Sequence, residues 1–158
     1  MKDLAALLFS FHGRITRTMW WIGTIITCAA CLAATYMLEP RLFDPESKMQ
    51  APPSILGTVA QLALLWPITA ISVKRLADCD WPAWPALILV PSSGILDIGP
   101  HFGFMVDIDH FTPGEKAVLI ALAIPGLALM LFNGSVRGTR GPNRHGPDPL
   151  QIQAQTAI

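Results

Sequence analysis

Charged residues are scarce in this sequence. They make up 14% of the chain, while apolar residues make up 52%. An ordinary soluble domain has about 25% charged residues, because a small domain has a large surface for its volume and needs charge to cover it. The composition therefore disfavours a soluble protein. The length of 158 residues allows one compact unit and no second domain.

Sequence patterns that carry chemistry are also missing. We find no nucleophile–base pair, phosphate-binding loop or paired carboxylates, so we expect no cofactor and favour a non-enzymatic role. The net charge of zero removes the basic surface that is typical of nucleic-acid binding. Cys28 and Cys31 form a C-x-x-C pair, but they lie in an apolar run. That setting disfavours the thiolate that redox chemistry or zinc binding requires, and it favours a helix-packing face.

One segment is rich in side chains that could bind a metal but lacks a ligand motif. It carries His101, Asp107, Asp109, His110 and Glu115. The tight spacing of a typical metal site is missing. A solvated acidic loop is the simpler interpretation, and no metal is predicted.

The few charges leave long uncharged runs between them. These runs cover residues 18–38, 49–73, 81–96 and 117–136. About 20 helical residues cross a hydrocarbon core ~30 Å thick. The sequence therefore predicts an all-α polytopic membrane protein, a single domain over residues 1–158 with four spans at about 18–38, 55–73, 81–98 and 113–136. The third span is short and contains Pro82, Pro85 and Pro91.

The segments outside the spans have recognisable signals of their own. Apolar residues at helical spacing between Leu4 and Phe11 predict a short N-terminal helix on the membrane surface, which ends at Gly13. Thr112, Pro113 and Glu115 predict a capping box at the start of the fourth span, in which we also expect a kink at Pro125. Residues 138–158 begin with a stretch rich in Gly and Pro, which predicts an irregular tail.

Basic residues sort to one side of this four-span arrangement. One face carries Lys2, Arg14, Arg17, Lys74, Arg75, Arg137, Arg140 and Arg144, and the other carries Arg41, Lys48 and Lys116. The basic face of a membrane protein is cytoplasmic. We therefore expect both termini in the cytoplasm, and the alternation requires the short third segment to cross the bilayer. Trp20, Trp21, Trp81 and Trp84 fall at the cytoplasmic boundaries, where aromatic rings favour the headgroup level.

Three of the polar residues inside the predicted spans are candidates for an intramembrane polar site: Gln61, Ser92 and Ser93. Gln61 in the second span lies at a similar depth to Ser92 and Ser93, where the third span is interrupted. Broken helix backbone at membrane depth must be buried in protein or line a cavity. The simpler interpretation is that Gln61 hydrogen-bonds across to the break. The alternative is a small polar cavity for a substrate, although no ionisable residue lies mid-span to mark an ion or proton path.

Three motifs in the chain resemble a known family. They are residues 11–17, FHGRITR, followed by Trp20; residues 73–78, VKRLAD, followed by Ala83 and Trp84; and residues 138–149, GTRGPNRHGPDP. Together they resemble the domain-of-unknown-function 805 family, small bacterial inner-membrane proteins with four predicted spans. The chain has Ala77, Ala83 and His145 where the family usually has His, Gly and Tyr. The resemblance implies the bacterial inner (plasma) membrane and brings no established activity.

The residues of these motifs suggest where function resides. We call eight of them the polar rim: Arg14, Arg17, Lys74, Arg75, Asp78, Asn143, Arg144 and Asp148. They flank the predicted spans on the cytoplasmic side, and they include more basic than acidic groups. We predict a non-catalytic membrane module whose polar rim binds a protein partner or anionic lipid headgroups. The alternative is a small transporter or channel subunit with a polar cavity at the broken third span, and a homo-oligomer is compatible with either.

Overall fold

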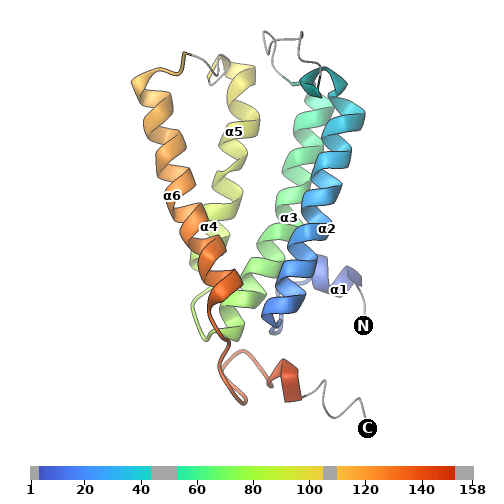
Figure 1. Cartoon of the computed structure of the whole chain (residues 1–158), viewed down its shortest axis with the longest axis vertical. Helices are drawn as coiled ribbons and strands as arrows, with labels where there is room; N and C mark the ends of the chain where they lie inside the picture. The colour runs from blue at the N-terminus through green and yellow to red at the C-terminus, as the bar shows by residue number, and fades with distance from the viewer. Residues whose placement is uncertain (1–3, 44–52, 105–109, 152–158) are drawn as a thin grey trace.

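The computed structural model describes residues 4–43, 53–104 and 110–151. All regular elements among these residues are helices, and the only β contact is a single bridge between Asn143 and Gly146. Three helices are long and apolar enough to cross a membrane: α2 (Arg17–Leu38), α3 (Ile55–Asp78) and α6 (Pro113–Ser135). The chain is thus an all-α multi-pass membrane protein. Figure 1 shows these helices side by side along the long axis of the molecule.

The third predicted span is a column of short helices. It consists of α4 (Trp84–Ser92), α5 (Gly94–Ile98) and the 3₁₀ helix η2 (Gly99–Phe102), which follow one another beside α3 (Figure 1). The column starts at residue 84 instead of 81, because Asp80 has a left-handed backbone (φ 59°) and Pro82 follows before Pro85 enters the first turn. No piece of the column is long enough to cross a membrane by itself.

Side-chain caps set where the long helices begin. Thr16 and Ser54 cap α2 and α3 by accepting hydrogen bonds from the N–H groups of Met19 and Gly57. The predicted capping box is confirmed, since Thr112 and Glu115 satisfy each other's backbone N–H groups at the start of α6. Helix α2 continues through a short 3₁₀ helix, η1 (Pro40–Phe43), at the end of the bundle where α3 begins.

The N-terminal helix is confirmed, with a shorter extent than predicted. It is α1 (Leu4–Phe9), and Gly13 follows four residues later with a left-handed φ of 94°. Helix α1 packs against the C-terminal end of α3, where Leu7 and Leu8 contact a buried cluster of Ile15, Trp20 and Ile71. We refer to this end of the bundle as the α1 end. Residues 138–151 lie at the same end (Figure 1).

Packing is densest at the α1 end and around α3. Residues 69–78 of α3 are all buried, whereas most side chains of α2 and α6 are exposed. Gly23 of α2 allows close approach, since a Cβ there would lie 3.3 Å from Ile71. On α6, Ile124 and Leu127 are 65% and 57% exposed. In a membrane these exposed apolar faces contact lipid.

Candidate functional site

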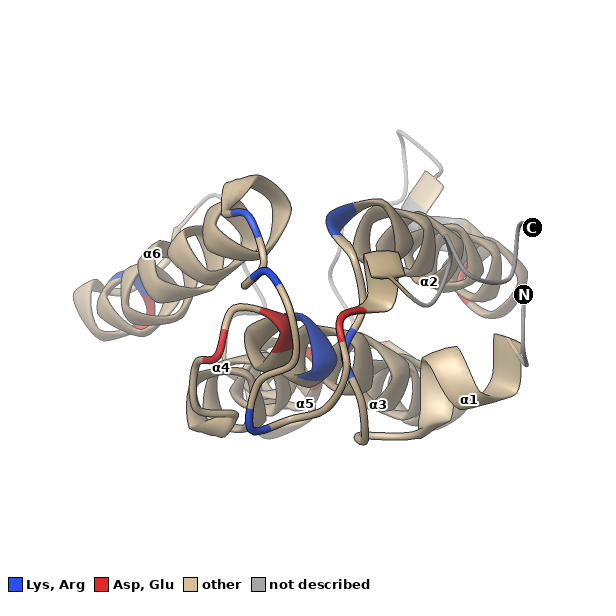
Figure 2. Cartoon of the chain, turned by 90° about the horizontal axis from the view of Figure 1, so that it is seen from below, with Lys and Arg blue, Asp and Glu red and all other residues tan. Residues whose placement is uncertain are grey.

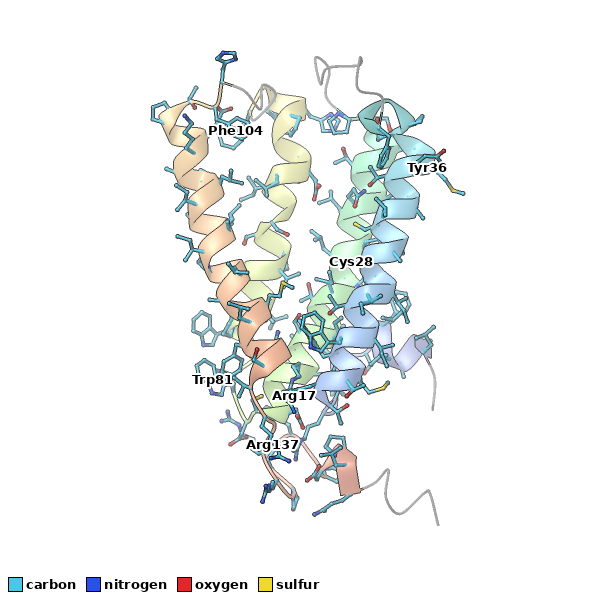
Figure 3. The ribbon with its side chains drawn as sticks, viewed as in Figure 1. Arg17, Cys28, Tyr36, Trp81, Phe104 and Arg137 are labelled. Atoms are coloured by element: carbon cyan, nitrogen blue, oxygen red, sulfur yellow. The ribbon has the colours of Figure 1, made fainter. Side chains whose placement is uncertain are left out.

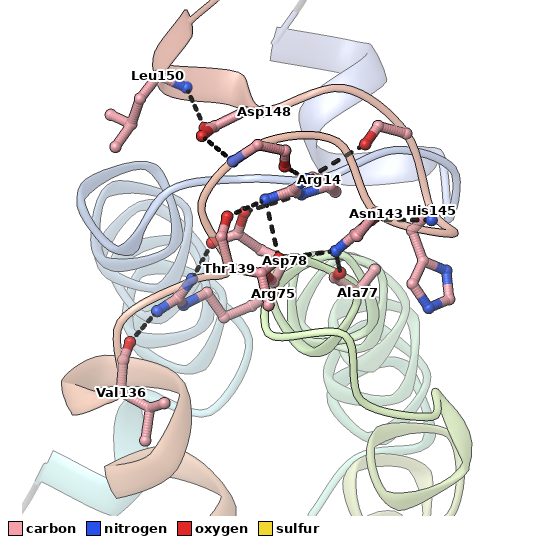
Figure 4. A network of polar contacts seen from close by, with 12 residues as sticks. Arg14, Arg75, Ala77, Asp78, Val136, Thr139, Asn143, His145, Asp148 and Leu150 are labelled. Carbon is pink, nitrogen blue, oxygen red and sulfur yellow. Dashed lines mark hydrogen bonds and ion pairs between the residues drawn. The ribbon is translucent and has the colours of Figure 1, made fainter.

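The polar rim is assembled from three segments that are distant in sequence. These are the loop after α1, the last turns of α3 and the chain from residue 136 to 151, which follows α6 (Figure 4). Figure 2, a view onto the α1 end, shows basic and acidic segments from these parts gathered between α2, α3 and α6. The predicted tail is thus ordered over residues 138–151, and residues 152–158 lie outside the described residues.

Arg14 is the centre of this network. Its side chain is 1% exposed, and all five of its N–H groups have acceptors. Nε donates to Asp78 Oδ1 at 3.1 Å, while Nη2 donates to the carbonyl (2.6 Å) and hydroxyl (3.2 Å) of Thr139. Nη1 donates to the carbonyls of Gly141 (2.7 Å) and Gly146 (3.2 Å). One arginine therefore joins the N-terminal loop to α3 and to the tail.

Asp78 connects Arg14 to a second buried arginine. Its other carboxylate oxygen pairs with Arg75, which is fully buried one turn earlier on α3. The backbone carbonyl of Asp78 accepts hydrogen bonds from the N–H (2.8 Å) and hydroxyl (3.0 Å) of Thr139. The tail passes so closely that a Cβ at Gly138 would overlap the Asp78 carboxylate. A carboxylate held between two guanidinium groups satisfies the requirement that a buried charge be paired.

Basic and aromatic side chains also cap the C-terminal end of α6. The last carbonyls of a helix have no partner within the helix, and cations are favoured there. Arg75 donates to the carbonyls of Asn133 (2.8 Å) and Val136. The indole of Trp21 donates to Gly134 at 3.3 Å, and Arg17 donates to Ser135 at 3.1 Å. Side chains of α2 and α3 thus satisfy four successive carbonyls at the end of α6.

Lys74 caps α1 in the same way. Its side chain is directed at the carbonyls of Ala6 (2.9 Å) and Leu7, near the end of the helix, and the residue is 3% exposed. These bonds explain why α1 lies across the end of α3: a buried ammonium needs acceptors, and the end of a short helix offers free carbonyls.

Asn143 and Asp148 shape the tail itself. Asn143 Nδ2 donates to the carbonyl of Ala77 and to the Thr139 hydroxyl, both at 2.9 Å. Asp148 accepts hydrogen bonds from the backbone N–H groups of Gly141 (2.9 Å) and Leu150 (3.0 Å). These two backbone hydrogen bonds lower the pKa of Asp148. Asp148 thus holds the tail in its own turns, and Asn143 fastens the tail to α3.

The remaining two members of the polar rim lie at its periphery. Arg144 pairs with Asp80 at 3.0 Å, but the two side chains are 59% and 44% exposed. Arg17 is also exposed and contacts the protein through the Ser135 carbonyl. The structure therefore links Arg14, Arg75, Asp78, Asn143 and Asp148 in a largely buried network. Lys74 is buried separately against α1, and Arg17 and Arg144 lie at the periphery.

A pocket of about 180 Å³ opens beside the network. It is lined by Thr16, Arg17, Thr18, Arg75, Asp78, Arg137, Gly138, Thr139, Arg140, Asp148, Pro149 and Leu150. Figure 3 shows Arg17 and Arg137 at the same end of the molecule, although they belong to chain segments at α2 and α6. Arg137 and Arg140 contributed to the predicted orientation of the chain, but neither was predicted as a site residue. Their position beside a predicted span was the available signal.

The prediction that Gln61 hydrogen-bonds to the break in the third span is wrong. Gln61 does not bond to the break in the third column; it accepts from Cys31 at 2.6 Å and donates to Thr35, both on α2. Ser92 and Ser93 donate to carbonyls of their own helix, Leu89 (2.9 Å) and Val90 (2.7 Å). A serine hydroxyl reaches a carbonyl one turn earlier in its own helix more easily than a group on another helix. The polar groups at the break are therefore hydrogen-bonded within the column. The kink expected at Pro125 stays a prediction.

No group of three or more His, Cys, Asp or Glu side chains that could hold a metal occurs among the described residues. Asp107 and Asp109, which belong to the acidic loop, lie outside that part of the chain. His101 instead makes a 2.7 Å hydrogen bond between its Nε2 and the hydroxyl of Thr58, which joins η2 to α3.

The helical architecture and the clustered motifs define a class, a multi-pass helical membrane protein whose N-terminal loop, α3 and tail are linked by one polar network. The family model described as "Protein of unknown function (DUF805)" matches residues 8–147, and the chain belongs to this family. That match includes the first two motifs and residues 138–147 of the third, so the resemblance found in the sequence is confirmed.

The chain is also similar to two curated proteins. The chain is 25% identical over 147 residues to the uncharacterized protein YiiR of Escherichia coli strain K12 and to that of Escherichia coli O157:H7. Each alignment covers 92% of this chain and 90% of the relative. No solved structure matches the chain.

Proposed function

We propose that the chain crosses the bacterial inner membrane four times, with both termini in the cytoplasm. Helix α3 ends at the α1 end of the bundle, and α6 begins at the opposite end (Figure 1). The column α4–α5–η2 lies in the chain between these two ends, which supports a fourth crossing by the column. The excess of Lys and Arg at the α1 end supports a cytoplasmic location for that end, by the positive-inside rule.

The function that the geometry supports best is a non-catalytic module that binds an anionic lipid at the α1 end. The observation that carries this proposal is the pocket lined by four arginines, beside the predicted membrane boundary at Trp20 and Trp21. Arg137 and Arg140 are exposed and make no hydrogen bond or ion pair within the described residues. Basic residues near an anionic leaflet each contribute about 1 kcal/mol to lipid attraction.

The buried part of the polar rim has a different role in this proposal. Arg14 has no N–H left for a ligand, and Lys74 is directed into α1. These buried residues hold the N-terminal loop, α1, α3 and the tail together. The exposed side chains of Arg17, Arg137 and Arg140 supply the positive charge that is available to a lipid. We therefore propose that lipid binds in the pocket and not over the whole polar rim.

Native mass spectrometry of the purified protein in mild detergent tests this function. We expect the protein to retain an anionic phospholipid such as phosphatidylglycerol in preference to zwitterionic phosphatidylcholine. We also expect added salt to weaken the preference, since exposed charges are screened. Equal retention of the two lipids would reject selective binding of an anionic lipid and leave a protein partner as the candidate ligand of this face.

The alternative, a transporter or channel subunit, rests on the interrupted column. Broken helices place substrate sites at mid-membrane in many transporters. The pairings described for Gln61, Ser92 and Ser93 reduce the polar groups available for such a site. Solute uptake into proteoliposomes that is abolished by Gln61→Leu would favour this function over lipid binding.

A further inference from the structure

The pocket at the α1 end has a strong positive bias. Four arginines line it: Arg17, Arg75, Arg137 and Arg140. Two aspartates also line it, which leaves a net formal charge of two positive. Both aspartates are already committed, because Asp78 pairs with Arg14 and Arg75 while Asp148 accepts two backbone hydrogen bonds. The positive charge is therefore available to a ligand that enters the pocket.

Arg75 gives the pocket a buried binding group. The residue is 0% exposed, and it uses one N–H at each of Nε, Nη1 and Nη2. A guanidinium has five N–H groups, so one at Nη1 and one at Nη2 have no acceptor among the described residues. Unpaired N–H groups are costly in a buried setting, and an anion in the adjacent pocket would satisfy them.

We propose that this pocket binds the phosphomonoester headgroup of an anionic lipid, an inference that rests on the lipid-binding function proposed above. A phosphomonoester carries about −1.5 to −2 charges at pH 7 and three strong acceptor oxygens. That charge matches the pocket, whereas the phosphodiester of an ordinary phospholipid carries a single charge. Arginine forks bind phosphate oxygens in pairs, which suits Arg75 at the base and the three exposed arginines around it.

The position of the pocket favours a lipid over a free phosphate compound. Arg17 is the first residue of α2, a helix long and apolar enough to cross a membrane, and Trp20 and Trp21 follow within one turn. Trp21 is 39% exposed, and aromatic rings favour the headgroup level. A lipid whose phosphate binds beside Arg17 would keep its acyl chains in the bilayer, where they would contact exposed apolar side chains such as Leu131.

The decisive experiment compares two lipids and two variants. Nanodiscs of phosphatidylcholine are doped with either phosphatidic acid, a phosphomonoester, or phosphatidylglycerol, a phosphodiester. Binding to the wild type is compared with the double variant Arg137→Gln/Arg140→Gln, since neither arginine makes a hydrogen bond or ion pair with another described residue. The matched control is Arg144→Gln, which removes an exposed arginine at the same end but outside the pocket.

We expect the wild type to prefer phosphatidic acid over phosphatidylglycerol. Each arginine removed from the pocket should weaken phosphatidic acid binding about fivefold, while the control keeps the wild-type affinity. Equal affinity for the two anionic lipids, or equal loss in the control, would overturn the phosphomonoester site while leaving anionic-lipid binding intact. Binding of neither lipid would reject the proposed function itself. Competition by water-soluble glycerol 3-phosphate as strong as that by phosphatidic acid would assign the pocket to a free phosphate compound.

Discussion

A single residue, Arg14, determines how the N-terminal loop and the tail are joined to α3. Its five hydrogen bonds reach Asp78, Thr139, Gly141 and Gly146 from a side chain that is almost fully buried. The planar fork of arginine is needed for this arrangement, because a lysine ammonium has three donors that diverge from one point. The positive charge alone would be enough to orient the chain in the membrane.

The substitution Arg14→Lys separates these two roles. It keeps the charge but loses at least two of the five hydrogen bonds, so we expect a loss of about 2–4 kcal/mol in the stability of the folded state. The measurements are the unfolding midpoint in detergent and the rate of proteolysis within residues 138–151. The exposed control Arg144→Lys should cost less than about 1 kcal/mol. An Arg14→Lys variant with wild-type stability would show that Arg14 serves only as a topology signal.

Asp148 makes the tail sensitive to acid. Hydrogen bonds from the Gly141 and Leu150 N–H groups lower the pKa of this carboxylate. A lowered pKa in the folded state means that the stabilisation is present above the unfolded pKa, about 3.9, and is lost as the pH falls through the folded pKa. The unfolding midpoints of wild type and Asp148→Asn should therefore differ at pH 7 and converge below about pH 4. A difference that is independent of pH would refute this role.

At the scale of elements, α3 is the helix on which the others are assembled. It contacts α1, α2, the column α4–α5 and α6, and its C-terminal half is buried. The pair α2–α3 is held by the side chain of Gln61, which bonds to Cys31 and Thr35. Such interhelical bonds in a membrane contribute about 0.6–2 kcal/mol.

Gln61→Leu should destabilise the protein in detergent by about that amount, because it leaves the α2 groups without their partner. Ser92→Ala is the matched control, since the Ser92 hydroxyl bonds only within its own helix, and it should leave the unfolding midpoint nearly unchanged. Equal midpoints for Gln61→Leu and wild type would mean that the α2–α3 contact does not depend on this polar link.

Gly94 is the point where α5 packs tightly against side chains of α3. A Cβ at this position would lie 2.8 Å from a terminal methyl of Leu62 and 3.1 Å from one of Leu65, so Gly94→Val should displace these side chains and cost about 1–3 kcal/mol. Gly126 in α6 has open space around it, and Gly126→Ala should be neutral or stabilising by up to about 1 kcal/mol. Thermal unfolding of both variants checks the contrast. If Gly94→Val proves as stable as Gly126→Ala, the column does not pack on α3 in this way.

At the scale of the whole molecule, the proposed four crossings can be tested by labelling. In a chain with Cys28→Ala, Cys31→Ser and Cys79→Ala, single cysteines are introduced at the exposed positions Trp81, Phe102 and Leu150. We expect a membrane-impermeant thiol reagent to label Phe102→Cys in intact cells, while the other two react only after permeabilisation. Serine at position 31 keeps a donor for Gln61.

Two outcomes of this labelling would contradict the proposal. Labelling of Leu150→Cys in intact cells would show that the α1 end faces outward, opposite to the proposed orientation. Equal labelling of Trp81→Cys and Phe102→Cys would mean that the column α4–α5–η2 does not cross the bilayer.

The sequence by itself determined the helical architecture, the family and the end of the bundle where polar residues gather. Membrane insertion depends on the length and composition of apolar runs, and capping depends on neighbouring residues such as Thr112 and Glu115, so both can be read locally. The family motifs likewise lie in contiguous stretches of sequence. These features require no knowledge of which segments meet in space.

Only the tertiary structure decided what the polar residues contact. The partner predicted for Gln61 from its depth in the membrane was wrong, because depth does not determine which helix a side chain faces. The polar rim was predicted as a set of residues, but the saturation of Arg14 and the pocket that Arg137 and Arg140 share with Arg17 were not predicted. Hydrogen-bond partners far apart in the chain are set by how the helices pack, and that packing arises from many weak contacts that no local pattern specifies.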